Sequence, residues 1–248
     1  MTYRRLVSFA SLVLMALLVT MCSPVAAQDP KTYIHPRAKA LLPEVGAEIE
    51  RLFPTLPKWE YVPGLIEHES CVTLRAAKCW NSTSELKTSR EQGVGLGQLT
   101  RAWDKIGNLR FDNLDVLRKR YPSEMGQADW ATFKDRPDLQ IRGILLMLKE
   151  DYNYFAFIKD EELRLQMTDS AYNGGRRDAQ RAREVCGMTK GCNPNRWFGN
   201  IENHCVKSKV ANPGYGGRNA CDINNGHVRD VFLIRMGKFK PYMDAMRE

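Results

Sequence analysis

The chain carries a candidate general acid near the end of a short apolar segment, Gly64–Ser70. Leu65 and Ile66 give Glu69 apolar neighbours, and we expect a carboxyl group in such surroundings to hold its proton near neutral pH, because burial disfavours the charged form. A protonated glutamic acid can donate to a leaving oxygen. A glutamate near a helix end is more often a solvated surface residue, so this hypothesis needs support from elsewhere in the chain.

Two later segments could hold a ligand through backbone and amide groups. Gly93–Gln98 has three glycines in five positions before its glutamine, and glycine lets a ligand approach the backbone while an amide both donates and accepts. The spacing does not match a dinucleotide fingerprint, and no lysine follows as a phosphate loop requires. Ala171–Gly175 reads Ala-Tyr-Asn-Gly-Gly. Each segment alone is equally well explained as a plain turn or a helix end.

Together and in this order, the three segments resemble the signatures of the soluble lytic transglycosylases and their goose-type lysozyme relatives. Those enzymes carry Glu-Ser, Gly-x-x-Gly-Leu-Met-Gln and Ala-Tyr-Asn-x-Gly, and here Glu69-Ser70, Gly93–Gln98 and Ala171–Gly175 stand in the same sequence. The resemblance covers residues 61–240. It implies an all-α, lysozyme-like domain with a sugar-binding cleft, which cuts the β-1,4 bond between N-acetylmuramic acid and N-acetylglucosamine in peptidoglycan glycan strands.

The resemblance also implies a role for each matching residue. Glu69 is the catalytic acid, and Ser70 orients either Glu69 or the muramyl group. Gln98 and the backbone around it contact the substrate, while the tyrosine and asparagine of the third segment line the cleft beside Glu69. The implied substrate-binding residues are Ser70, Gly95, Gly97, Gln98, Tyr172 and Asn173.

A single carboxylate restricts the mechanism. Most glycoside hydrolases use two acidic residues, but no second one is obvious here, because Glu67 lies two residues from Glu69 and points elsewhere on a helix. A lone Glu69 suffices if it protonates the glycosidic oxygen and then takes the proton from the muramyl C6 hydroxyl, which closes a 1,6-anhydro ring. This chemistry requires no metal and no cofactor.

Two departures from the family pattern keep other functions open. Gly97 stands where the family commonly has methionine, which puts subsite preference in doubt. The stretch from Glu69 to Gly93 is long, as in goose-type lysozymes, so Glu85 or Glu91 could position water for a hydrolase. A muramidase is therefore the alternative enzyme, and a non-catalytic wall-binding module on the same scaffold is the alternative of a different class.

Residues 1–27 are predicted to be a secretory signal peptide. Two arginines precede the short apolar run Leu6–Val19, and small residues at 24–27 suit cleavage before Gln28. The run is shorter than a membrane-spanning helix needs, although an uncleaved anchor is the alternative. Cys22 suggests lipidation, but Met21 before it is not the small residue that such processing prefers. The prediction is export to the periplasm or the outside.

Cysteine usage agrees with export. Seven cysteines are present, and an even set remains once Cys22 is removed, as expected for disulfides in an oxidising compartment. Zinc is disfavoured because there is no Cys-x-x-Cys pair and the four histidines are scattered. We interpret His35, His68, His204 and His227 as structural or solvated. Proximity favours three pairs: Cys71–Cys79, Cys186–Cys192 and Cys205–Cys221.

The positive net charge of the chain suggests that it acts near anionic partners. The formal net charge is +8, two units of which lie in residues 1–27, and a basic exported protein suits a bacterial envelope or its wall polymers. No DNA-reading motif or aromatic-basic interleaving supports nucleic acid. We expect a monomer that can associate with envelope or secretion machinery.

Hydrophobic spacing predicts an all-α fold, stapled by disulfides in its loops, because no window alternates at period two. The expected domains are the signal peptide, a helical extension at 28–60 and the lysozyme-like domain at 61–248. Ser70–Gln92 and Cys186–Asn224 are predicted to be irregular. The predicted helices begin with one from Pro43 to the Phe53–Pro57 break, followed by Tyr61–Glu69, Arg101–Tyr121, Asp138–Phe157, Glu161–Asn173, Arg177–Val185 and a last one capped by Asn225.

Overall fold

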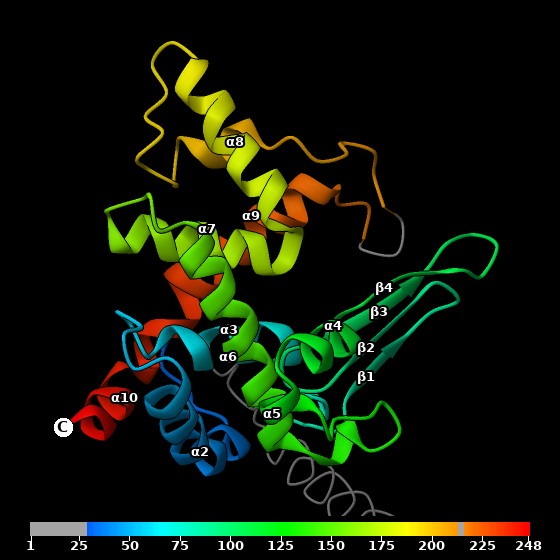
Figure 1. Ribbon diagram of the computed structural model, residues 1–248. Helices are drawn as coiled ribbons and strands as arrows, with labels where there is room; N and C mark the ends of the chain where they lie inside the picture. The colour runs from blue at the N-terminus through cyan, green and yellow to red at the C-terminus, as the bar shows by residue number, and fades with distance from the viewer. Residues whose placement is uncertain (1–28, 213–215) are drawn as a thin grey trace, which may run out of the picture.

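The computed structural model describes residues 29–212 and 216–248. The protein is mainly helical, and one small antiparallel sheet projects from the helical body (Figure 1). The predicted signal peptide lies outside the described residues. Within those two ranges, no helix is long and apolar enough to cross a membrane.

The elements follow in chain order. The principal helices are α2 (Pro36–Leu52), α3 (Tyr61–Ser70), α4 (Asn113–Arg120), α5 (Pro122–Met125), α6 (Pro137–Tyr154), α7 (Glu161–Gly174), α8 (Arg176–Met188), α9 (Ala220–Asp230) and α10 (Lys240–Arg247). The strands are β1 (Glu85–Lys87), β2 (Glu91–Val94), β3 (Leu99–Trp103) and β4 (Leu109–Asp112). Short turns of 3-10 or π type are η1 (Phe133–Asp135), η2 (Ile201–His204), η4 (Val231–Arg235) and η5 (Met236–Phe239).

The core is organised around α3, which is buried along most of its length. Its apolar side chains pack with those of α2, α6 and the C-terminal turns in one cluster, so the segment predicted as an extension contributes to the same core. Gly64 lets η5 approach, because a Cβ there would lie 2.9 Å from the Met236 Cα. The predicted helices at Tyr61–Glu69, Asp138–Phe157 and Glu161–Asn173 are confirmed, and no end differs by more than three residues.

The prediction of a purely helical fold is wrong at 85–112. The four strands pair in the order β1-β2-β3-β4, each antiparallel to the next, where irregular chain and the first half of a helix were expected. The helical spacing of the apolar residues misled because Ile106 and Leu109 lie outside the core that buries Leu114 and Leu117. Ile106, for example, is 84% exposed at the turn between β3 and β4, where Asp104 Oδ1 accepts from the backbone N–H groups of Ile106 and Asn108 at 2.9 Å.

Two predicted helix starts also need correction. Pro43 lies inside α2, which begins at Pro36 with the His35 ring accepting from the backbone. Asn225 lies inside α9 rather than capping it, because Asn219 and Asp222 form a reciprocal capping box. In both helices, α2 and α9, a polar cap several residues before the predicted start defines the N-terminal end.

The three predicted disulfides are confirmed. Cys71 pairs with Cys79, Cys186 with Cys192 and Cys205 with Cys221. The latter two connect α8, the following loop and α9, which enclose a second, smaller apolar cluster. A chain with three disulfides is typical of an oxidising, extracytoplasmic compartment.

Candidate active site

Buried hydrogen bonds and a disulfide hold the C-terminal end of α3 in place. Ser70 is buried, and its hydroxyl donates to the Ile66 carbonyl at 2.7 Å while accepting from the Trp80 backbone N–H at 3.1 Å. The Cys71–Cys79 disulfide closes the same loop. Ser70 therefore holds the end of the helix that carries Glu69 in place.

Glu67 points away from Glu69, as predicted. Its carboxylate is fully buried and forms ion pairs with Lys238 at 2.5 Å and Arg235 at 3.4 Å. Burial raises the pKa of Glu67 even though these cations oppose the effect. The residue serves to attach α3 to the C-terminal turns.

Glu69 is linked to a histidine from a distant part of the chain. Its side chain is 15% exposed, and Oε1 lies 2.8 Å from Nε2 of His227 on α9. His227 is buried, with Nδ1 2.8 Å from Oδ2 of Asp169 on α7. Tyr61 of α3 donates its hydroxyl proton to Oδ1 of Asp169 at 2.9 Å. One hydrogen-bonded chain thus joins α3, α7 and α9 and ends at Glu69.

The two neighbouring carboxylates favour the charged form of the His227 ring. Burial by itself lowers the pKa of His227, but the charges of Asp169 and Glu69 and their hydrogen bonds outweigh burial and raise it to about 10. Both ring nitrogens therefore donate, one to each carboxylate. The purely apolar setting expected for Glu69 needs correction, because its nearest polar partner is positively charged.

Tyr172 connects the second and third sequence segments. Its hydroxyl donates to the Gly97 carbonyl at 2.8 Å. Burial, followed by the negative charges of Glu69 and Asp169, raises the pKa of Tyr172 well above its ordinary value. The tyrosine is thus a neutral donor within electrostatic reach of Glu69, and the three segments converge on one site.

The glycine-rich loop is shaped by close internal contacts. Gly95 has a φ of +80°, and a Cβ there would lie 2.1 Å from Oε1 of Gln140, which accepts from the Leu96 N–H at 2.9 Å. Gln98 donates its amide to the Gly95 carbonyl at 2.8 Å. Gly95 and Gly97 are both buried. The loop backbone is therefore engaged mainly within the protein, and the half-buried Gln98 is its better candidate for touching a ligand.

The space of the expected methionine at position 97 is occupied. A Cβ on Gly97 would lie 2.4 Å from Ile144 Cγ1 and 2.6 Å from the Tyr172 hydroxyl. We predict that Gly97→Met lowers the free energy of unfolding by about 1–3 kcal/mol, the usual cost of overpacking, measured by urea denaturation. The matched control is Gly187→Met, since a Cβ there has only ordinary contacts with Pro194 at 3.6 Å. Equal stability of the two variants would contradict the packing described.

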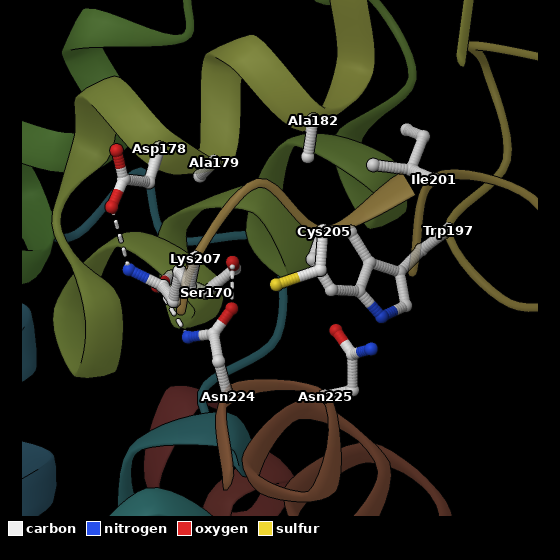
Figure 2. Close-up of a pocket in the computed structure, with 10 residues that line it drawn as sticks. All are labelled: Ser170, Asp178, Ala179, Ala182, Trp197, Ile201, Cys205, Lys207, Asn224 and Asn225. Atoms are coloured by element: carbon white, nitrogen blue, oxygen red, sulfur yellow. Dashed lines mark hydrogen bonds and ion pairs between the residues drawn. The ribbon is translucent and has the colours of Figure 1, made fainter. Parts of the chain in front are cut away.

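Asn173 forms the exposed edge of a polar contact between α7 and α9. Asn224 donates its amide to Asn173 Oδ1 at 3.1 Å and to the Ser170 carbonyl at 2.9 Å. Figure 2 shows the small pocket behind this contact, where Ser170 and Asn224 face Lys207 and Asp178. Its volume of about 10 Å³ is that of one water molecule. It is too small for a sugar, so Asn173 and not this pocket belongs to the candidate site.

A larger cleft of about 260 Å³ lies between α4, α6 and the start of α8. Its wall includes Asp151, whose carboxylate is 2.8 Å from Nε of Arg176. Burial raises the pKa of Asp151 to about 6, against the influence of Arg176. The charge of Asp151 also contributes to the raised pKa of Tyr172. The negative charges of Glu69 and Asp151 therefore both act on Tyr172.

One group of potential metal ligands is found among the described residues. Cys186, Cys192 and His204 bring their ligand atoms within 4.8 Å of one another. The two cysteines are joined as a disulfide, and the thiolate is the form that binds metals. The group does not fit a metal centre in this oxidation state.

Sequence reasoning placed the three motifs but missed His227, Asp169 and Tyr61. The only available signal was Asp169 itself, an acidic residue on an apolar helix, three residues before Tyr172. The glutamates suggested as water-positioning groups lie on the sheet, where Glu85 is exposed and accepts from Gln92.

No protein-family model matches the chain, and no curated protein is significantly similar to it.

Proposed function

We propose that this protein is an exported peptidoglycan-cleaving enzyme of the lytic transglycosylase type, with Glu69 as its single general acid and base. The observation that carries the proposal is the convergence of three motifs. Tyr172 of the third donates to Gly97 of the second, and the charge of Glu69 acts on the same tyrosine. The proposal includes a lysozyme-like arrangement of the helices around this centre.

The chemistry follows from the position of one partly exposed carboxyl group. Glu69 donates a proton to the oxygen between the muramyl and glucosaminyl units, and the C1–O4 bond breaks. The resulting carboxylate then removes the proton of the muramyl C6 hydroxyl as O6 bonds to C1, which gives a 1,6-anhydro end. Glu67 takes no part, because it is buried in ion pairs. Tyr172, as a neutral donor, is suited to stabilise charge that develops on the sugar.

Charge and compartment support a wall substrate. The chain is basic overall, with a net charge of +8, and its disulfides suit the oxidising side of the membrane. Both properties favour contact with an anionic envelope. We therefore place the enzyme in the periplasm or outside the cell, delivered by a cleaved signal peptide.

A muramidase that adds water is the second candidate. The observation that favours it is Asp151, a buried carboxyl group with a pKa of about 6, whose charge acts on the same tyrosine as that of Glu69. Most glycoside hydrolases use a pair of acidic residues, and Asp151 would supply the second.

Mass spectrometry of muropeptides released from purified sacculi tests the proposal and separates the two candidates. We expect products with anhydromuramyl ends, each lighter by one water than a hydrolysed end. Hydrolysed ends would establish the muramidase. Intact sacculi after incubation with the oxidised protein would overturn both candidates and leave the non-catalytic module.

A further inference from the structure

The buried ion pair beside Glu69 is more than a packing element. Asp169 is fully buried, His227 is 1% exposed, and their atoms meet at 2.8 Å. Removing two charges from water costs several kcal/mol per ion before their attraction is counted. A nonpolar pair of similar volume would fill the same space without this cost. The pair instead directs one N–H donor, at Nε2 of His227, onto Glu69.

Other ionisable groups also lie near the imidazole of His227. The His68 ring of α3 lies 4.2 Å from the His227 ring, centroid to centroid, and its own Nδ1 is 2.5 Å from Asp230. Asp230 also pairs with Arg235 of η4. Asp169 and Glu69 are the two groups bonded directly to the His227 ring nitrogens, so their protonation states and that of His227 are coupled.

We propose that His227 is a positioning residue, held as an imidazolium by Asp169, which fixes Glu69 Oε1 and leaves Oε2 to exchange the catalytic proton. The inference rests on the proposed function in one respect, the assignment of Glu69 as the acid. In the first step the proton on Oε2 moves to the glycosidic oxygen. In the second, Oε2 receives the proton of the C6 hydroxyl. His227 keeps both of its protons throughout.

Asp169→Asn separates the charge from the geometry. The new amide oxygen can accept from the Tyr61 hydroxyl, as Oδ1 does now at 2.9 Å, and the new amide nitrogen donates to Nδ1 of His227. The imidazole then becomes neutral but still carries a proton on Nε2 facing Glu69. The hydrogen-bonded chain remains, while the positive charge beside the acid is lost.

The expected result is a change in the pH profile of activity. Because a nearby positive charge favours the ionised form of an acid, we expect loss of the cation to move the alkaline limb of kcat/KM on soluble glycan strands to higher pH. A merely structural histidine would lower activity at every pH without moving the limb. His227→Gln, which keeps one amide donor, is expected to move the limb in the same direction.

Imidazole nitrogen NMR gives a second test, which does not depend on activity. We expect both His227 nitrogens to be protonated at pH 8, and only Nε2 in Asp169→Asn. A neutral His227 at pH 8, or an unmoved alkaline limb in an active Asp169→Asn enzyme, would overturn the positioning role while leaving the proposed function intact. If the unmodified protein releases no muropeptides, the proposed function fails first, and NMR still decides whether His227 is charged.

Discussion

Glu69→Gln is expected to lower the rate of muropeptide release by about 10²–10⁴-fold, the usual contribution of a general acid or base. Glutamine has nearly the same shape, and its amide oxygen can still accept from His227 Nε2, now at 2.8 Å from the carboxylate. The substitution therefore removes proton transfer and leaves the surrounding hydrogen bonds in place. Release of soluble fragments from purified sacculi measures the effect.

The matched control is Glu50→Gln, a change of the same kind at an exposed position of α2. It is expected to retain full activity and the same melting temperature. Should the Glu69 variant clear sacculi as fast as the control, Glu69 is not the acid, and the assignment of the site is wrong. A protein that binds sacculi equally well before and after the change, and cuts them in neither form, would be the wall-binding module.

The second large effect concerns stability above neutral pH. The pKa of His227 is about 10 in the folded protein, compared with 6.5 for an ordinary histidine. Because the folded value is raised, the stabilising contribution is complete below about pH 6.5 and disappears as the pH rises toward 10. At 1.36 kcal/mol per pKa unit, the free energy of unfolding falls by up to about 5 kcal/mol over this window.

Denaturant unfolding at pH 6, 8 and 10 measures this loss. Asp169→Asn is the control, because its neutral His227 has nothing left to titrate in that window. We expect the variant to be less stable than the unmodified protein at pH 6 and to change less with pH. Parallel curves for the two proteins would show that deprotonation of His227 does not control the alkaline loss.

Local signals in the sequence predicted the helical part of the fold well. Asp138–Phe157 carries a wide apolar stripe and Glu161–Asn173 is ended by two glycines, and both form helices. The disulfides were also predictable, because each pair is separated by only 6 to 16 residues. The sheet was not, since Ile106 and Leu109 are exposed apolar residues whose three-residue spacing mimics a helix although neither contributes to a core.

The candidate site could be predicted only in part, for a similar reason. The three motifs are short and continuous, so the residues of Glu69-Ser70, Gly93–Gln98 and Ala171–Gly175 are visible in the sequence. His227, by contrast, lies 158 residues from the glutamate it contacts, and it stands in no motif. Only the packing of α9 against α7 brings it to Glu69, and spacing along the chain carries no information about such a contact.

The distance in sequence between Glu69 and His227 has a consequence for the order of events during biosynthesis. The glutamate emerges early and its imidazole partner late, and the same C-terminal part supplies the Lys238 and Arg235 cations that anchor α3. A chain that lacks its last helices thus contains Glu69 but not the charged groups that surround it. The centre is therefore complete only once the C-terminal helices have folded onto α3 and α7.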